Sequence, residues 1–347
     1  MPLFESPSPN IISYRAANDA LSLGDLRGNR FELVIRDICE ATEDQVNSAV
    51  AGFAREGFIN YFGLQRFGCS TIPSHLIGSS LLAGNWDQAI SLILDPRDGE
   101  NDERAVIARR HWKETGDAKA AHSLFPHRYT AERQILAHFA RAEGNLQDKL
   151  GAIMSINREL RMMYVHSVQS WIWNRMTSFR HASLGKELKI GDLVMDPSQE
   201  VISLTADNIS NYSIEDLILP MPGYSSKYPE NEIGAKYREA LKGLGISDLQ
   251  TAWKPKNKAL WDLPGAYRKL YICPEDVKWR IAHYENPDED IKLDREENLE
   301  ETGHHVGLVI AFTLPSSSYA TMAIRELMHG GTDPKVHKNK TKRHKTQ

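Results

Sequence analysis

Alternating apolar and polar positions mark two stretches near opposite ends of the chain. Phe31, Leu33 and Ile35 alternate with the polar residues Glu32 and Arg36, which predicts a half-buried β-strand. Residues 308–314 repeat the alternation and predict a second strand. The serines at 316–318 can cap a helix that continues to Leu327. A helix should also follow the first strand, because Thr42 and Gln45 form a capping box and Gly57 can end the helix.

The middle of the chain changes to helical spacing. Residues 74–150 show amphipathic helical patterns, and one long helix is predicted over about residues 147–181. Residues 186–218 are β-like between turn residues. The prolines and glycine at 220–223 then predict a connector. Strands and helices in this order predict an α+β protein.

Composition narrows the choice of partners. The chain has 347 residues, 41% hydrophobic and 25% charged, which is typical of a globular protein with a substantial core. A net charge of −4 excludes a uniformly basic RNA-coating protein, so any nucleic-acid contact must use a local basic patch. Cys39, Cys69 and Cys273 are widely spaced, which favours a reducing compartment over a disulfide framework or a metal site. The sequence predicts neither a membrane span nor a secretory signal.

The stretch at residues 59–68, INYFGLQRFG, holds the most specific candidate chemistry. If residues 59–62 are extended, Asn60 and Phe62 point to the same side. An amide beside a flat aromatic ring, with further donors on Gln65 and Arg66, suits an unstacked nucleotide base. The alternative is the end of a core strand followed by a glycine turn.

A second candidate combines aromatic and basic residues. Trp253 and Trp261 flank Lys254, Lys256 and Lys258. This interleaving suits RNA, but lysines that extend past a buried tryptophan to solvent would give the same pattern.

Two charged segments have simpler interpretations. The acidic residues between 285 and 301 predict a solvated loop. The Lys/His-rich tail, residues 329–347, predicts disorder and either nonspecific phosphate contacts or an import signal.

Six stretches in order resemble one family. They are LSLGDLRGNRFELVIRD, NYFGLQRFG, LRMMYVHSVQSWIWN, LPMPGY, AYRKLYICPEDVKW and IAFTLPSSSYATMAIREL. Together they resemble the tRNA pseudouridine synthase D (TruD) family, especially its eukaryotic and archaeal branch, over nearly the whole chain. The resemblance implies a pseudouridine synthase core, which is a mixed sheet with flanking helices, interrupted by a large α/β insertion.

Mapped onto this sequence, the resemblance places the N-terminally incomplete core at residues 1–84 and its return at 263–328. The insertion would cover 85–262, and the two parts would form a cleft for RNA. The basic tail would follow at 329–347.

The resemblance also implies roles for single residues. Phe62 matches the family's aromatic that stacks on the target uracil, and Asn60 matches its hydrogen-bonding companion. Arg66, Asn174 and Arg325 fall within family motifs and are candidate substrate contacts. An arginine beside the nucleophile could keep that group ionised, and either Arg325 or Arg268 could do so or could be an ordinary surface charge.

The reaction of this family needs a nucleophilic or basic aspartate held against a base that has left the RNA stack. It needs no cofactor or metal. In the family this aspartate belongs to a Gly-x-Lys-Asp type motif ahead of LGDLRGN. Here LGDLRGN already begins at Leu23, so we expect that motif to be missing and assign no catalytic residue. Asp19 and Asp25 match no nucleophile position, and Asp25 is a typical turn residue.

Two functions follow. The chain is either most of a tRNA-type RNA pseudouridine synthase that has lost the front end with its nucleophile, or a catalytically silent RNA-binding or tRNA-chaperoning module. A scaffold unrelated to RNA would leave the pair Asn60 and Phe62 without a purpose. We expect tRNA and other RNAs as partners, a monomer, and a location in the nucleus or cytoplasm.

Overall fold

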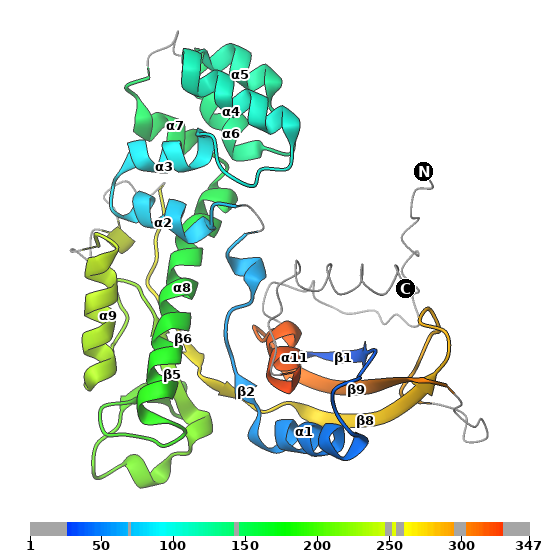
Figure 1. Cartoon of the computed structure of the whole chain (residues 1–347). Helices are drawn as coiled ribbons and strands as arrows, with labels where there is room; N and C mark the ends of the chain where they lie inside the picture. The colour runs from blue at the N-terminus through cyan, green and yellow to red at the C-terminus, as the bar shows by residue number, and fades with distance from the viewer. Residues whose placement is uncertain are drawn as a thin grey trace, which may run out of the picture.

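The computed structural model describes residues 26–68, 71–141, 146–246, 252–254, 260–294 and 303–328. Asp19, Asp25, Cys69 and the tail 329–347 lie outside these residues, so the predictions made for them are not addressed by the fold. The chain forms two lobes, a compact one with β1, β8 and β9 and an elongated one arranged along α8 (Figure 1).

The compact lobe is a three-stranded antiparallel sheet covered by two helices. The strand order is β1 (Gly28–Ile35), β9 (His305–Pro315), β8 (Glu275–Tyr284). Phe31 lies opposite Phe312 across β1 and β9, as the two alternating patterns require. Helices α1 (Glu43–Glu56) and α11 (Ala320–Met328) bury Phe53 and Met322 against this sheet. Each such side chain contributes roughly 1.5–3 kcal/mol when fully buried.

Both strand predictions and the capping box are confirmed in this lobe. Thr42 Oγ1 accepts a hydrogen bond from the Gln45 backbone N–H, and the Gln45 side chain accepts one from the Thr42 N–H. Gly57 directly follows α1 and has a positive φ of 64°. A Cβ at this position would also lie 2.2 Å from the Ile272 carbonyl oxygen. Both the positive φ and this close approach therefore require glycine.

The elongated lobe is mainly helical. Its helices are α2 (Ser74–Leu82), α3 (Trp86–Leu94), α4 (Glu103–Thr115), α5 (Ala118–Leu124), α6 (Thr130–Arg141), α7 (Lys149–Ser155), α8 (Arg158–Leu184) and α9 (Glu232–Gly243). Helix α2 packs closely on α8 at Gly78, where a Cβ would lie 2.1 Å from the Tyr164 carbonyl oxygen.

The prediction of one continuous helix over residues 147–181 was wrong. Helix α7 ends at Ser155, Ile156 is extended, and α8 begins at Arg158. Asn157 caps the new helix by accepting a hydrogen bond from the Glu159 N–H at 2.8 Å. The apolar spacing continues across this break, so spacing alone does not reveal it.

A four-stranded antiparallel sheet supports the base of α8. Its order is β4 (Val201–Ser203), β3 (Leu193–Met195), β5 (Leu217–Met221), β6 (Ala266–Lys269). The 3₁₀ turns η2 (Ile209–Asn211) and η3 (Ile214–Asp216) connect β4 to β5.

The predicted connector at residues 220–223 was partly wrong, because β5 runs through Pro220 to Met221. Within β5, only Leu217 and Ile218 pair with β3. At Pro220, β5 therefore has β6 as its single neighbouring strand. A proline is tolerated at such a position because its missing N–H breaks no ladder on the open side.

A short ladder joins the lobes. Strand β2 (Phe58–Ile59) pairs with β7 (Tyr271–Ile272), and β7 directly follows β6 in the chain. The predicted core boundaries at 84/85 and 262/263 stay predictions. In the structure, α2 packs on α8 and β6 pairs with β5, so both belong by packing to the elongated lobe.

Candidate functional site

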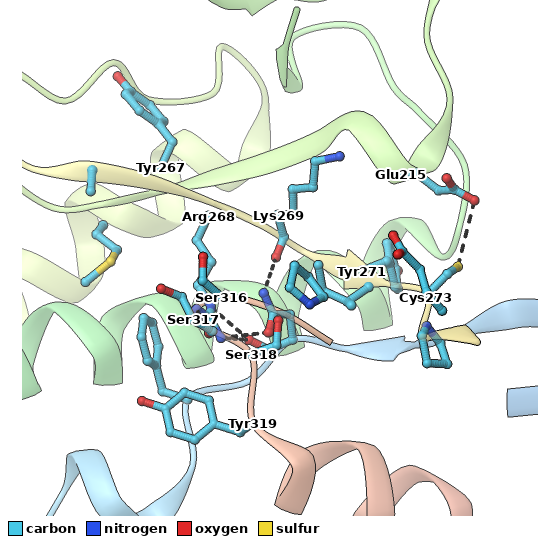
Figure 2. Close-up of a pocket in the computed structure, with 18 of the residues that line it drawn as sticks. Glu215, Tyr267, Arg268, Lys269, Tyr271, Cys273, Ser316, Ser317, Ser318 and Tyr319 are labelled. Atoms are coloured by element: carbon cyan, nitrogen blue, oxygen red, sulfur yellow. Dashed lines mark hydrogen bonds between the residues drawn. The ribbon is translucent and has the colours of Figure 1, made fainter. Parts of the chain in front are cut away.

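A cavity of about 650 Å³ lies where the two lobes meet. Its walls come from segments far apart in sequence: residues 60–66, the strands and turn at 266–275, and the loop 315–319 that leads into α11. Figure 2 shows how Arg268, from β6, and the loop at Ser316–Ser318 approach each other across this cavity. The stretch singled out in the sequence therefore contributes Asn60, Phe62 and Arg66 to the lining of a cavity between the lobes.

The backbone around Phe62 is held by α8. The Phe62 N–H donates to Asn174 Oδ1 at 2.9 Å, and Asn174 Nδ2 donates to the Phe62 carbonyl at 3.0 Å. One helical turn further, Ser178 hydrogen-bonds the Tyr61 hydroxyl at 2.9 Å. Asn174, a candidate substrate contact in the sequence, is thus committed to positioning the segment that carries Phe62.

The Phe62 ring lines the cavity but is only 5% exposed. Trp173 and Tyr319 meet it edge-on, with centroids 5.6 Å and 6.2 Å away. The guanidinium of Arg268 lies 4.1 Å from the ring centroid, and that of Arg66 lies 5.6 Å away. The sequence predicted a ring available to an unstacked base. The structure instead buries Phe62 within a hydrophobic core cluster, with aromatic and guanidinium groups next to the ring.

Arg268 forms hydrogen bonds to two of the segments that line this cavity. Its guanidinium donates to the Asn60 carbonyl at 2.8 and 2.9 Å, to Asn60 Oδ1 at 2.7 Å and to the Ser317 carbonyl at 2.6 Å. Asn60 Nδ2 donates to the Lys269 carbonyl at 3.2 Å. Asn60 is 4% exposed, and both its side-chain oxygen and its side-chain nitrogen form hydrogen bonds.

The Ser317 carbonyl reaches Arg268 through an unusual backbone conformation. Ser317 has a φ of 66°, which is disfavoured for a residue with a Cβ. The hydrogen bond from Arg268 helps to hold it there.

The pKa of Arg268 is lowered to about 10, chiefly by burial; Tyr319 acts in the opposite direction, and the nearby Arg66 guanidinium contributes to the lowering. Arg268 still carries its charge at neutral pH. Among the residues that the structure describes, it forms no ion pair and is neutralised only by carbonyl oxygens and aromatic faces. A buried cation of this kind favours an anion or a polarised carbonyl group in the cavity.

The two other candidate arginines lie in different places. Arg66 lines the cavity and donates from Nε to the Tyr319 hydroxyl at 3.2 Å. Arg325 lies on the exposed face of α11 and is not part of the cavity lining. Of the two arginines considered as partners for a nucleophile, the structure therefore brings Arg268, and not Arg325, to Phe62.

Sequence reasoning did not single out Tyr319 or Lys269, which also line the cavity. Tyr319 sits at the end of the SSSY run, and Lys269 belongs to the AYRKL stretch. Alternation along β6 would have placed Arg268 and Lys269 on opposite faces, but nothing local indicates which face meets Phe62.

Cys273 also borders the cavity, with its sulfur 3.8 Å from a carboxylate oxygen of Glu215. Burial raises the pKa of this thiol, and Glu215 raises it further. The thiol stays protonated at neutral pH, which does not suit a nucleophile.

Within the described ranges, no cluster of three or more His, Cys, Asp or Glu side chains is arranged to hold a metal ion. No helix in those ranges is both long and apolar enough to cross a membrane.

Comparison with known proteins identifies the family of this chain. The family model described as "tRNA pseudouridine synthase D (TruD)" matches residues 4–327. The chain belongs to the TruD family. The resemblance inferred from the six sequence stretches is confirmed, as is the α+β fold class.

Individual relatives agree with the TruD assignment. The chain is 36% identical to the multisubstrate pseudouridine synthase 7 of Schizosaccharomyces pombe over 92% of its length and 51% of that protein. It is 35% identical to the human pseudouridylate synthase 7 homolog, over 91% of its length and 48% of that protein. It thus spans about half the length of these relatives.

A solved structure shares the TruD fold. It is the crystal structure of a protein described as tRNA pseudouridine synthase D from Methanosarcina mazei, with a TM-score of 0.69 and 25% identity. The superposition covers 89% of this chain and 70% of that one.

Proposed function

We propose that this chain supplies the uridine-binding cleft of an RNA pseudouridine synthase that acts on tRNA and on other RNAs. The observation that supports this most strongly is the cavity between the lobes, where Phe62 and Arg268 are fixed against each other by Asn60 and Asn174. Nucleus or cytoplasm is the proposed location, and a monomer the proposed state.

The cavity offers groups that suit uracil. Uracil is planar, carries two carbonyl oxygens and has one ring N–H in its nucleoside form. Phe62 and Tyr319 provide aromatic surfaces at the cavity wall. Arg66 and Arg268 provide donors for carbonyl oxygens, and the backbone carbonyls of the loop 315–319 provide acceptors. Because Phe62 is only 5% exposed, a base can stack on it only if a neighbouring side chain moves aside, and Arg66, which is exposed and 5.6 Å from the ring centroid, is the candidate in this proposal.

Pseudouridine formation moves the sugar–base bond from a ring nitrogen to a ring carbon and leaves the atom count unchanged. The step needs an aspartate, and none of the residues described near the cavity is assigned this role. In this proposal Arg268 is the cation that faces the aspartate and keeps it ionised. We expect the 347-residue chain alone to bind RNA but to form no pseudouridine.

A binding experiment tests the cleft. Phe62→Leu keeps an apolar side chain but removes the flat face, so affinity for transcribed tRNA should fall by roughly 1–3 kcal/mol. Phe31→Leu, in the core sheet away from the cavity, is the matched control. Fluorescence anisotropy measures both. Equal affinities for Phe62→Leu and Phe31→Leu would remove the stacking role.

A catalytically silent RNA-binding or tRNA-chaperoning module is the second candidate, and it would use the same cleft. Two measurements separate the candidates. An in-frame Gly-x-Lys-Asp motif encoded upstream of Met1 would favour the synthase. Pseudouridine formed by this chain on transcribed tRNA would instead show that our assignment of no nucleophile is wrong.

A further inference from the structure

Of the aromatic and basic residues predicted as a second candidate, the structure describes Trp253, Lys254 and Trp261, whereas Lys256 and Lys258 lie outside the described residues. Trp253 and Trp261 are core residues, 0% and 2% exposed, so the interpretation as buried tryptophans holds for them. Lys254 is exposed, and its ammonium lies 4.4 Å from the centre of the Tyr224 ring. This lysine belongs to a wider surface of alternating rings and cations.

We name this surface the Tyr–Lys surface and define it by five residues: Tyr224, Lys227, Lys254, Tyr267 and Lys269. Strand β6 carries Tyr267 and Lys269, which project from the face of the strand opposite to Arg268 (Figure 2). Both residues also border the cavity between the lobes. The surface therefore starts at the candidate uridine site.

Backbone and side-chain contacts make the surface continuous. The Lys227 N–H donates to the Tyr267 hydroxyl at 2.7 Å. The Tyr224 N–H donates to the Leu263 carbonyl, and the Leu263 N–H donates to the Trp253 carbonyl, next to Lys254. Glycines allow this close approach, because a Cβ at Gly223 would lie 2.1 Å from the Gly265 nitrogen. The loop 222–228, residues 252–254 and β6 thus form one packed unit.

The charge of this surface differs from that of the whole chain. Residues 222–230, 252–254 and 260–269 contain the cations Lys227, Lys254, Arg268 and Lys269 and only two carboxylates, Glu230 and Asp262. The net charge of the whole chain is −4. All three lysines are exposed, and none forms an ion pair with a residue that the structure describes. Such lysines attract a polyanion and release counterions when they bind it.

We propose that the Tyr–Lys surface binds single-stranded RNA next to the modified uridine, with the lysines on phosphates and the tyrosine rings beneath bases. This rests on the proposed function, because it extends the same substrate beyond the cavity. Rings interleaved with cations favour RNA over an acidic peptide, which would use the lysines but leave the ring faces without a stacking partner. Continuity with the cavity places the bound strand directly beside the flipped base.

The test compares two RNA probes by fluorescence anisotropy over a range of KCl concentrations. One is a labelled single-stranded 15-mer with a central uridine, and the other is a labelled trimer with the same uridine. The triple variant Lys227→Gln, Lys254→Gln, Lys269→Gln removes the surface charges. The matched control is Lys119→Gln, Lys242→Gln, Lys278→Gln, which removes three exposed lysines elsewhere.

The surface variant should bind the 15-mer on the order of tenfold more weakly. The slope of log K against log salt concentration should also become shallower by about 2, because each of the three lost phosphate contacts contributes about 0.7 to that slope. Binding of the trimer should fall by a smaller factor than binding of the 15-mer, because only Lys269 of these three lysines borders the cavity. Tyr267→Leu should weaken the 15-mer while leaving the salt slope unchanged, because stacking releases no counterions.

Three results would count against the proposal. Equal losses in the surface variant and the control would overturn the Tyr–Lys surface while leaving the cavity in place. Equal weakening for the trimer and the 15-mer would place the lysines at the uridine itself and overturn the extended strand. If the unmodified chain binds neither probe, the proposed function fails together with this extension.

Discussion

Asn174 holds Phe62 by both polar groups of its backbone, although 112 positions separate the two residues. The side-chain amide matches the peptide of Phe62 as a second strand would, with one donor and one acceptor. The aromatic ring of the candidate site is therefore positioned by α8, the longest described helix, although the ring itself lies in a segment without regular secondary structure.

Replacing Asn174 tests this grip. Asn174→Leu leaves the Phe62 N–H and carbonyl without partners, and the free energy of unfolding should fall by about 2–4 kcal/mol. Urea denaturation gives the value. Ser178→Ala, which removes the neighbouring bond to Tyr61, is the control and should cost less than about 1.5 kcal/mol, because that bond is exposed. A larger loss for Ser178→Ala would show that Tyr61, and not Phe62, anchors the segment.

Arg268→Lys tests whether the shape of the guanidinium matters as well as its charge. A lysine keeps the charge but cannot reach Asn60 Oδ1, the Asn60 carbonyl and the Ser317 carbonyl together. The variant should be less stable by about 2–4 kcal/mol and should bind tRNA more weakly. Arg30→Lys, exposed on β1, serves as the control. Unchanged stability and binding in Arg268→Lys would mean that charge alone suffices.

Two glycine substitutions should act in opposite directions. Gly223→Ala places a methyl group 2.1 Å from the Gly265 backbone nitrogen, so stability should fall by about 1–3 kcal/mol. Gly52→Ala, within α1 and with no atom within 4 Å of the new methyl, should raise stability by about 0.5–1 kcal/mol. Thermal unfolding measures both changes. The prediction is wrong if both variants shift the midpoint in the same direction.

His166 should make the fold sensitive to acid. Its burial lowers its pKa below 6.5, and Arg66 lowers it further, while the hydrogen bond to Gln169 acts in the opposite direction. Below pH 6.5 the unfolded chain therefore binds more protons than the folded one, and stability falls as the pH decreases through this range. His166→Gln cannot titrate, so it should lose less stability than the unmodified chain between about pH 7.5 and 5.5. Equal losses measured by thermal unfolding would contradict this role.

Local patterns predicted much of the fold. The alternation at 31–35 and 308–314 gave two of the three strands of the compact lobe, and Thr42 gave the start of α1. The errors arose where one residue overrides a pattern. Asn157 caps α8 and so separates two helices although the apolar spacing continues, and Pro220 lies in a strand because that part of β5 has only one neighbour.

The candidate site was harder to predict because its contacts are distant in sequence. Asn60 and Phe62 were identified from local chemistry and family resemblance, but Asn60 meets Arg268 across 208 positions. The sequence left Arg268 open between a functional and an ordinary charge. Only the fold shows that β6 directs it at Phe62 and that the ring is consequently buried.

The segment from Asn60 to Phe62 is fastened to both β6 and α8, and β2 just before it belongs to the junction with β7. A hinge between the lobes would have to pass through this junction and would break hydrogen bonds on both sides of it. Under the proposed function, the cleft would therefore keep its width when RNA binds. The nucleic acid would then supply most of the motion, by swinging one base out of its stack.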